Sequence, residues 1–199
     1  MSRDITMCHP RLQVLADNLV AECKKQGLQV KIGECFRSVQ EQNELYAQGR
    51  TKKGSIVTYA KGSDCSSMHQ WGVAFDVIRN DGKGAYNNSD GWFDKVGKIG
   101  KALGLEWGGD WTSPVDKPHF QLSDWGSTAT RLKNLYGNVD NFKRTWVVKK
   151  VEKKKITTYD EAVKVLVKNG VISSQAYWDN AVKCVKYLDG LIINMANKF

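Results

Sequence analysis

The sequence predicts an α+β fold, a small antiparallel sheet flanked by helices, followed by a small α-helical module at the C-terminus. Two observations carry this prediction. Segments with apolar residues at helical spacing are interspersed with short segments in which apolar and polar residues alternate, as in half-buried strands. The 199 residues also suffice for one domain with its own core and a small second unit.

Three helices are expected in the first part of the chain. Residues 10–26 carry apolar residues at helical spacing, and Gly27 follows as a stop signal. Residues 38–41 (Ser-Val-Gln-Glu) are typical of a capping box and begin a helix that ends at Gly49. A third helix is expected over residues 90–103, before a glycine.

The strands are expected between and after these helices. Residues 29–36 and 75–78 read as strands, and shorter strands are expected near 105–107 and 119–122. A polar, glycine-containing loop is expected over residues 50–66.

A change of character at about Trp146 divides the chain. We expect a catalytic domain at residues 1–145, a basic linker at 146–155 and a helical module at 156–199, with helical patterns over 159–169 and 175–197. Residues 146–199 hold ten lysines against five acidic residues. This charge favours binding to an anionic wall polymer, and a homodimer through the module is the alternative.

Composition excludes several classes of protein. The chain is 41% hydrophobic and 26% charged, and no apolar run approaches the roughly 20 residues that span a bilayer. The net charge of +9 favours a polyanionic partner, but no nucleic-acid-binding motif is evident, and neither nucleic acid nor membrane is expected as a partner. The N-terminus lacks the apolar core of a Sec signal peptide, so synthesis in a cytoplasm is expected. Five cysteines without Cys-x-x-Cys spacing argue against a disulfide framework and a thiolate zinc site.

Two segments carry the candidate site. Residues 67–76 hold His69 and Asp76, and residues 116–121 hold Asp116 and His119. Two imidazoles and two carboxylates can bind one zinc ion through three ligands, leave a fourth position open, and keep one carboxylate as a base. A hydrogen-bonded core or surface histidine is the alternative, and it is preferred for His9.

The pattern Ser67-x-His69-x-x-Gly72-x-Ala74-x-Asp76, followed by Asp116-x-x-His119, resembles the zinc peptidases that cut bacterial peptidoglycan peptides. This group contains D-alanyl-D-alanine carboxypeptidases, of the VanY type, and L-alanyl-D-glutamate endopeptidases, and the likeness runs from about residue 35 to 122. Residues 36–38, 45–51 and the Asp-x-Pro-His-Phe-Gln ending resemble the endopeptidase branch found in bacteriophage endolysins. The implied fold is a small hedgehog-like zinc peptidase domain.

The resemblance and the chemistry together suggest roles. His69, Asp76 and His119 would bind Zn²⁺, and Asp116 would be the general base. The resemblance implies that Arg37 bonds the carbonyl oxygen as it gains charge, with a surface salt bridge as the alternative. Four residues are expected to bind substrate: Ser67, Gln42, Trp107 and Trp111. Ser67 could equally be a turn serine, and we expect one of the two tryptophans to line the cleft, because such aromatics are more often in the core.

Three functions are therefore considered. The leading one is a phage endolysin that hydrolyses the L-alanyl-D-glutamate bond of peptidoglycan stem peptides and reaches the cell wall after release from the host cytoplasm. The second is a D-alanyl-D-alanine carboxypeptidase or dipeptidase. The third is a non-catalytic wall-binding protein, against which the spare carboxylate of Asp116 argues.

Overall fold

The computed structural model describes residues 2–146, 157–168, 171, 178 and 188–196. The chain divides into two compact units, Met1–Val148 and Lys149–Phe199. Trp146, the first residue of the expected linker, packs against the core of the first unit. The other residues of that linker, 147–155, lie outside the described residues.

The first unit contains a four-stranded antiparallel sheet in the order β1-β2-β4-β3. Its strands are β1 (Val30–Glu34), β2 (Ala74–Arg79), β3 (Glu106–Trp107) and β4 (His119–Gln121). Each expected strand segment overlaps one of them, and the expected α+β fold with a small antiparallel sheet is confirmed. The first strand is shorter than expected, and its register with β2 shifts between Ile32 and Glu34.

The helices α1 (Pro10–Lys25), α2 (Val39–Ala47) and α3 (Trp92–Ala102) lie where the sequence predicts them. Ser38 and Glu41 form the expected capping box at the start of α2. Two short helices, α4 (Thr130–Tyr136) and α5 (Val139–Arg144), were not predicted. Each has one buried apolar residue, Leu132 or Phe142, which is too little for a periodic pattern.

Five short 3-10 helices complete this unit. They are η1 (Ile5–Met7), η2 (Gly62–Asp64), η3 (Met68–Trp71), η4 (Gly108–Asp110) and η5 (Ser123–Trp125).

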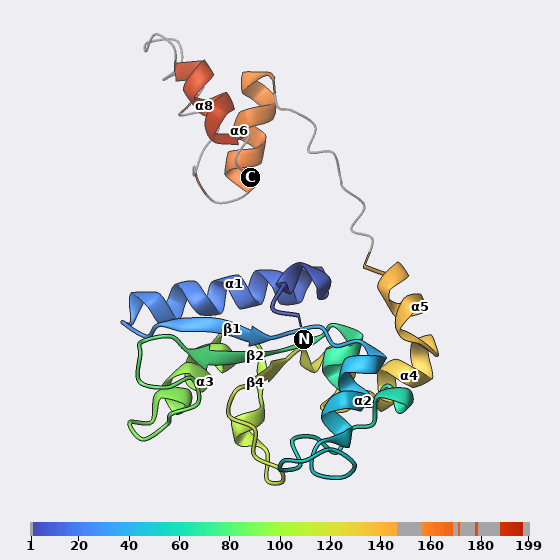
Figure 1. Ribbon diagram of the computed structural model, residues 1–199. Helices are drawn as coiled ribbons and strands as arrows, with labels where there is room; N and C mark the ends of the chain where they lie inside the picture. Colours follow the sequence, from blue (N-terminus) through green and yellow to red (C-terminus); the bar gives the residue numbers. More distant parts are fainter. Residues whose placement is uncertain (1, 147–156, 169–170, 172–177, 179–187, 197–199) are drawn as a thin grey trace. The chain divides into compact units, whose positions relative to one another are not determined.

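Helices α1 and α3 contact each other and cover one face of the sheet (Figure 1). Phe75 of β2 and Phe120 of β4 are fully buried on this face and stack with ring centroids 5.7 Å apart. Gly100 of α3 lies against Phe120, where an added Cβ would come within 2.3 Å of the ring. Because side chains alternate along a strand, Asp76 and His119 point to the opposite face.

The second unit is helical in its described part, as expected. Helices α6 (Tyr159–Lys168) and α8 (Leu188–Ala196) contact each other. Their buried residues form a separate small core of Ala162, Val163, Leu166, Ile192 and Ala196. The second expected helix, at 175–197, is described only from residue 188 to 196, apart from residue 178. Among the described residues, no helix combines the length and the apolar character that a membrane span requires.

Candidate metal centre and active site

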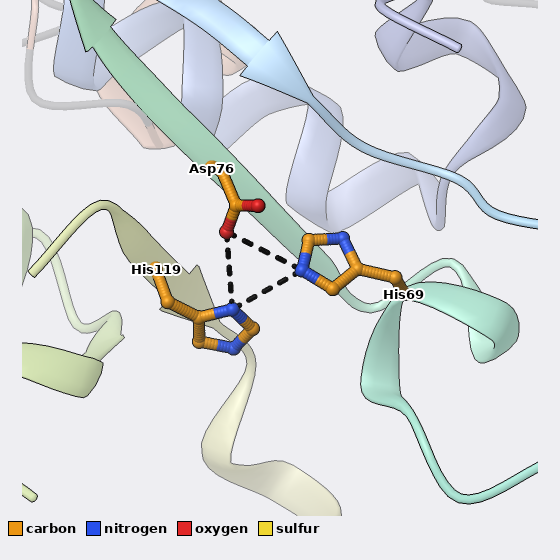
Figure 2. A group of neighbouring side chains, drawn as sticks. All are labelled: His69, Asp76 and His119. Carbon is orange, nitrogen blue, oxygen red and sulfur yellow. Dashed lines mark hydrogen bonds and ion pairs between the residues drawn. The ribbon is translucent and has the colours of Figure 1, made fainter. Parts of the chain in front are cut away.

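The three predicted metal ligands come from three elements and point toward one another (Figure 2). His69 lies in η3, Asp76 on β2 and His119 on β4, and the sheet register pairs Asp76 directly with His119. Nε2 of His69 is 3.3 Å from Oδ1 of Asp76, and Nδ1 of His119 is 3.2 Å from each of these atoms. Ligand atoms bound tetrahedrally to one zinc ion lie about 3.3 Å apart. The three residues therefore fit such an ion.

The turn between η3, which contains His69, and β2 depends on a glycine. Gly72 ends η3 with a φ of 67°, a left-handed conformation that favours glycine. A Cβ at this position would also come within 2.6 Å of the ring of Trp146. A side chain at residue 72 would therefore disturb the turn that separates His69 from Asp76.

Each histidine is held at its outer nitrogen. Nδ1 of His69 lies 2.7 Å from the carbonyl oxygen of Cys35, and Nε2 of His119 lies 2.9 Å from Oε1 of Gln121. Both partners are acceptors, so each outer nitrogen donates a proton, and when a ring is neutral, as a metal ligand must be, its inner nitrogen turns a lone pair toward Asp76. Three electron-rich atoms that face one another in this way form a site for a cation.

The charges of these groups support one another. Burial alone would raise the pKa of Asp76, but the neighbouring His69 and His119 hold it well below its ordinary value. Burial would lower the pKa of His119, but its hydrogen bond to Asp76 and the charge of that carboxylate raise it. Asp76 is therefore ionised, as a metal ligand must be.

Asp116 lies in the same cleft as the three ligands. Burial raises the pKa of Asp116 above its ordinary value, and the charge of Asp76 adds to the shift. The backbone around it is held by close packing, since its N–H donates to the carbonyl of Gly108 over 2.9 Å. A Cβ on Gly108 would come within 2.5 Å of the Asp116 carbonyl oxygen. The position thus supplies a carboxylate beside the cation site.

Arg37 also lines the cleft, and four of its five N–H groups are engaged. Its guanidinium binds Glu34 through two bonds of 2.6 and 2.9 Å, Gln42 at 3.1 Å and Oδ2 of Asp76 at 3.3 Å. One N–H on Nη1 has no partner among the described residues. The side chain of Arg37 is 11% exposed, so its ion pairs with Glu34 and Asp76 are largely shielded from solvent.

Gln42 does not lie where the sequence leads us to expect it. It was expected to bind substrate, but its side chain is 0% exposed and does not line the cleft. Its Oε1 accepts from Arg37, and its Nε2 donates to Thr58 and to the carbonyl of Ala60. Gln42 therefore supports Arg37 and the following loop, without a surface for substrate.

The two tryptophans separate as expected, with one in the cleft. Trp111 lines it, with its ring centroid 5.0 Å from that of His119. Trp107, the other tryptophan expected to bind substrate, does not line the cleft: it is 6% exposed, packs on Gly97 and donates from Nε1 to the carbonyl of Lys117. Ser67 lines the cleft next to η3.

The cleft has a volume of about 500 Å³ and includes three further residues, Glu34, Tyr86 and Gln121, to which the sequence assigns no role. Glu34 holds Arg37, Gln121 holds His119, and Tyr86 is 70% exposed at the cleft. The two-residue spacing of Gln121 and His119 on a strand was a usable signal, because such residues share a face. Nothing in the sequence marks Glu34 or Tyr86.

Comparison with known proteins gives matches over this unit. Residues 60–122, which include all three ligands and Asp116, match a family model described as D-alanyl-D-alanine carboxypeptidase. Over 124 residues the chain is 44% identical to the peptidoglycan L-alanyl-D-glutamate endopeptidase CwlK of Bacillus subtilis (strain 168), covering 57% of this chain and 72% of that protein. It is 32% identical over 120 residues to the L-alanyl-D-glutamate peptidase of Listeria phage A118, covering 55% of this chain and 38% of that protein.

Two solved structures are similar at lower identity. The Serratia marcescens L-Ala D-Glu endopeptidase ChiX is 21% identical with a TM-score of 0.45, covering 60% of this chain and 83% of that one. The vancomycin resistance D,D-pentapeptidase VanY, in complex with Zn(II), is 13% identical with a TM-score of 0.41, covering 69% and 76%. On the strength of its 44% identity over most of CwlK, the chain belongs to the metallopeptidase family that contains the peptidoglycan L-alanyl-D-glutamate endopeptidases.

Proposed function

We propose that this protein is a phage endolysin that hydrolyses the L-alanyl-D-glutamate bond of peptidoglycan stem peptides. The observation that carries the proposal is the 44% identity to an endopeptidase of that name, over the unit in which the three candidate ligands and Asp116 share one cleft. The likeness to a phage peptidase supports the endolysin role. In this role the protein is made in the host cytoplasm and acts at the wall after release.

His69, Asp76 and His119 are the residues that would hold zinc. Bound there, zinc would acidify a water molecule and polarise the scissile carbonyl. The two neutral imidazoles and the one carboxylate leave this site a net positive charge when it is loaded, which suits both effects.

Asp116 would take the proton from the attacking water and deliver it to the leaving amine. A base in this role works best when its pKa lies closer to the working pH than that of a free aspartate. Burial shifts the pKa of Asp116 in this direction. The remaining N–H of Arg37 is available to the carbonyl oxygen as it gains charge, while Glu34 and Gln42 keep the guanidinium in place.

The cleft favours an endopeptidase over the alternative carboxypeptidase. A carboxypeptidase needs a cation that captures the terminal carboxylate of its substrate. Among the described residues that line the cleft, Arg37 is the only lysine or arginine, and it is already bound to two carboxylates. A peptide chain that continues on both sides of the bond needs no such cation. Trp111 and Ser67 lie where they can contact it.

The test is digestion of purified cell wall, with the new termini identified by mass spectrometry. The proposal predicts a new N-terminal D-glutamyl peptide, L-alanine left on the muramyl side, and intact D-alanine ends. Free D-alanine without any new glutamyl amine would establish the carboxypeptidase alternative.

The C-terminal module, residues 156–199, would recruit the enzyme to anionic wall polymers. Its support is the excess of lysine over acidic residues after residue 146, most of which lies in the basic linker that precedes the module. A chain shortened to residues 1–150 should still cleave a soluble stem peptide but sediment less with intact wall. Salt should weaken the binding of the full chain, because exposed charges are screened over about 8 Å at physiological ionic strength. Equal sedimentation of the two chains would refute recruitment, and loss of peptide cleavage would indicate that the module completes the fold or a homodimer.

A further inference from the structure

Gln121 is a fully buried polar residue at the edge of the candidate metal site. It lies on β4 two residues after His119, so the two side chains share one face of the strand. Its neighbour across the ladder on β2 is Ala74, whose small side chain leaves room on this face. Oε1 of Gln121 accepts a hydrogen bond from Nε2 of His119 over 2.9 Å.

The amide nitrogen of Gln121, Nε2, lies in an unusual environment for a buried polar group. Among the described residues, its Nε2 has no hydrogen-bond partner, although the atom is buried. An unpaired buried donor costs about 1–3 kcal/mol. An apolar residue of similar size would avoid this cost, so the contact with His119 offers a better reason for a glutamine than stability does.

That contact determines which nitrogen of His119 carries the proton. Since the amide oxygen only accepts, the neutral ring that binds a metal carries its proton on Nε2, and its Nδ1 turns a lone pair toward Asp76 and His69. At His69 the carbonyl oxygen of Cys35 has the same effect with the two ring nitrogens exchanged. A backbone carbonyl cannot be altered by substitution, but Gln121 can.

We propose that Gln121 is a positioning residue for the metal centre, which holds the ring of His119 in the orientation and tautomer that present Nδ1 to the ion. The proposal rests on the zinc site of the proposed function. It assigns to Gln121 an effect on metal affinity, exerted through His119 and without contact to the ion.

The experiment compares zinc affinity among variants of the full chain, measured by competition with a chromophoric chelator. Gln121→Leu should bind zinc about 10–100-fold more weakly, as is common when the partner of a ligating histidine is lost. Gln121→Glu should stay close to the unsubstituted protein, because a carboxylate still accepts from Nε2. Gln121→Asn, whose oxygen is withdrawn by one methylene, should lie between them.

Gln13→Leu is the matched control. Gln13 donates from Nε2 to the carbonyls of Thr6 and Cys8, far from the ligands in the sequence and outside the cleft. Its loss tests whether the removal of any hydrogen-bonded glutamine weakens zinc binding, and unchanged affinity is expected. The visible spectrum of the cobalt-substituted proteins provides a second readout, which should change in Gln121→Leu and not in Gln13→Leu.

The outcomes are distinct. Zinc affinity in Gln121→Leu and Gln121→Asn equal to that of the unsubstituted protein would overturn the proposal. If Gln121→Leu does not fold, the order of Gln121→Glu above Gln121→Asn decides, and equal affinities refute the inference. Absence of zinc binding in the unsubstituted protein would instead refute the zinc site of the proposed function.

Discussion

The two faces of β2 and β4 differ in chemistry although their residues alternate along the same two strands. Toward the helices, Phe75 and Phe120 stack within the core. Toward the cleft, Asp76, His119 and Gln121 form the candidate metal site and its support. Phe120 lies between two cleft residues in the sequence, so its packing holds the strand that positions both. The comparison shows how a packed face can fix the geometry of a polar one.

The two faces also contribute differently to stability. Burial of the aromatic rings stabilises the fold. The cleft face instead gathers polar groups that contribute little to stability: three ligand atoms within 3.3 Å of one another, a partly buried carboxyl of raised pKa and an unpaired amide. We therefore expect substitutions on the packed face to affect stability, and those on the cleft face to affect metal binding and rate.

The largest effect is expected on the cleft face. His119→Ala and His69→Ala should each lose zinc and all measurable peptide hydrolysis, because two ligands do not retain the ion. Zinc content by elemental analysis and peptide cleavage check this. His9→Ala, which changes the third histidine, should keep its zinc. Stoichiometric zinc in either ligand variant would contradict the assignment.

On the packed face, Phe120→Ala should lower the free energy of unfolding by about 3–5 kcal/mol, as expected for a buried aromatic residue that leaves a cavity. Urea denaturation of the zinc-free protein measures it. Below the unfolding transition this variant should still bind one zinc. A loss under 1 kcal/mol would show that the packed face is not the main support of the sheet.

Asp116→Asn should keep zinc but lower the rate of hydrolysis about a hundredfold or more, because the general base is lost. Steady-state cleavage of a stem peptide, with zinc content measured on the same sample, tests this. If zinc is lost together with activity, Asp116 is a ligand and the division of roles within the cleft is wrong.

A smaller effect of Asp116 should appear in the stability of the zinc-free protein. Its pKa is raised in the folded state, so the folded chain binds the proton more tightly than the unfolded chain. Ionisation of Asp116 therefore lowers stability as the pH rises from the ordinary pKa of aspartate, about 3.9, through the raised value. Asp116→Asn should remove this loss and be the more stable protein at pH 7 in urea denaturation. If the difference in stability between Asp116→Asn and the unsubstituted chain were the same at pH 7 and at pH 4, this would count against a raised pKa of Asp116.

The sequence by itself determined the helices α1, α2 and α3, the positions of the strands and the residues of the candidate metal site. These depend on signals that span only a few residues: apolar spacing, the capping box at Ser38, and the short motifs around His69 and His119. Helices α4 and α5 were missed because each contributes one residue to the core, which produces no periodic signal.

Only the tertiary structure decided which polar and aromatic residues reach the cleft. Gln42 and Trp107 are buried while Trp111 lines the cleft, although nothing near them in the sequence separates these cases. Burial depends on what packs against a side chain from distant segments, as Thr58 and Ala60 do on Gln42. The pairing of Glu34 with Arg37 and of Gln121 with His119 was also decided by the tertiary structure. A hydrogen bond between side chains depends on where the elements that carry them lie.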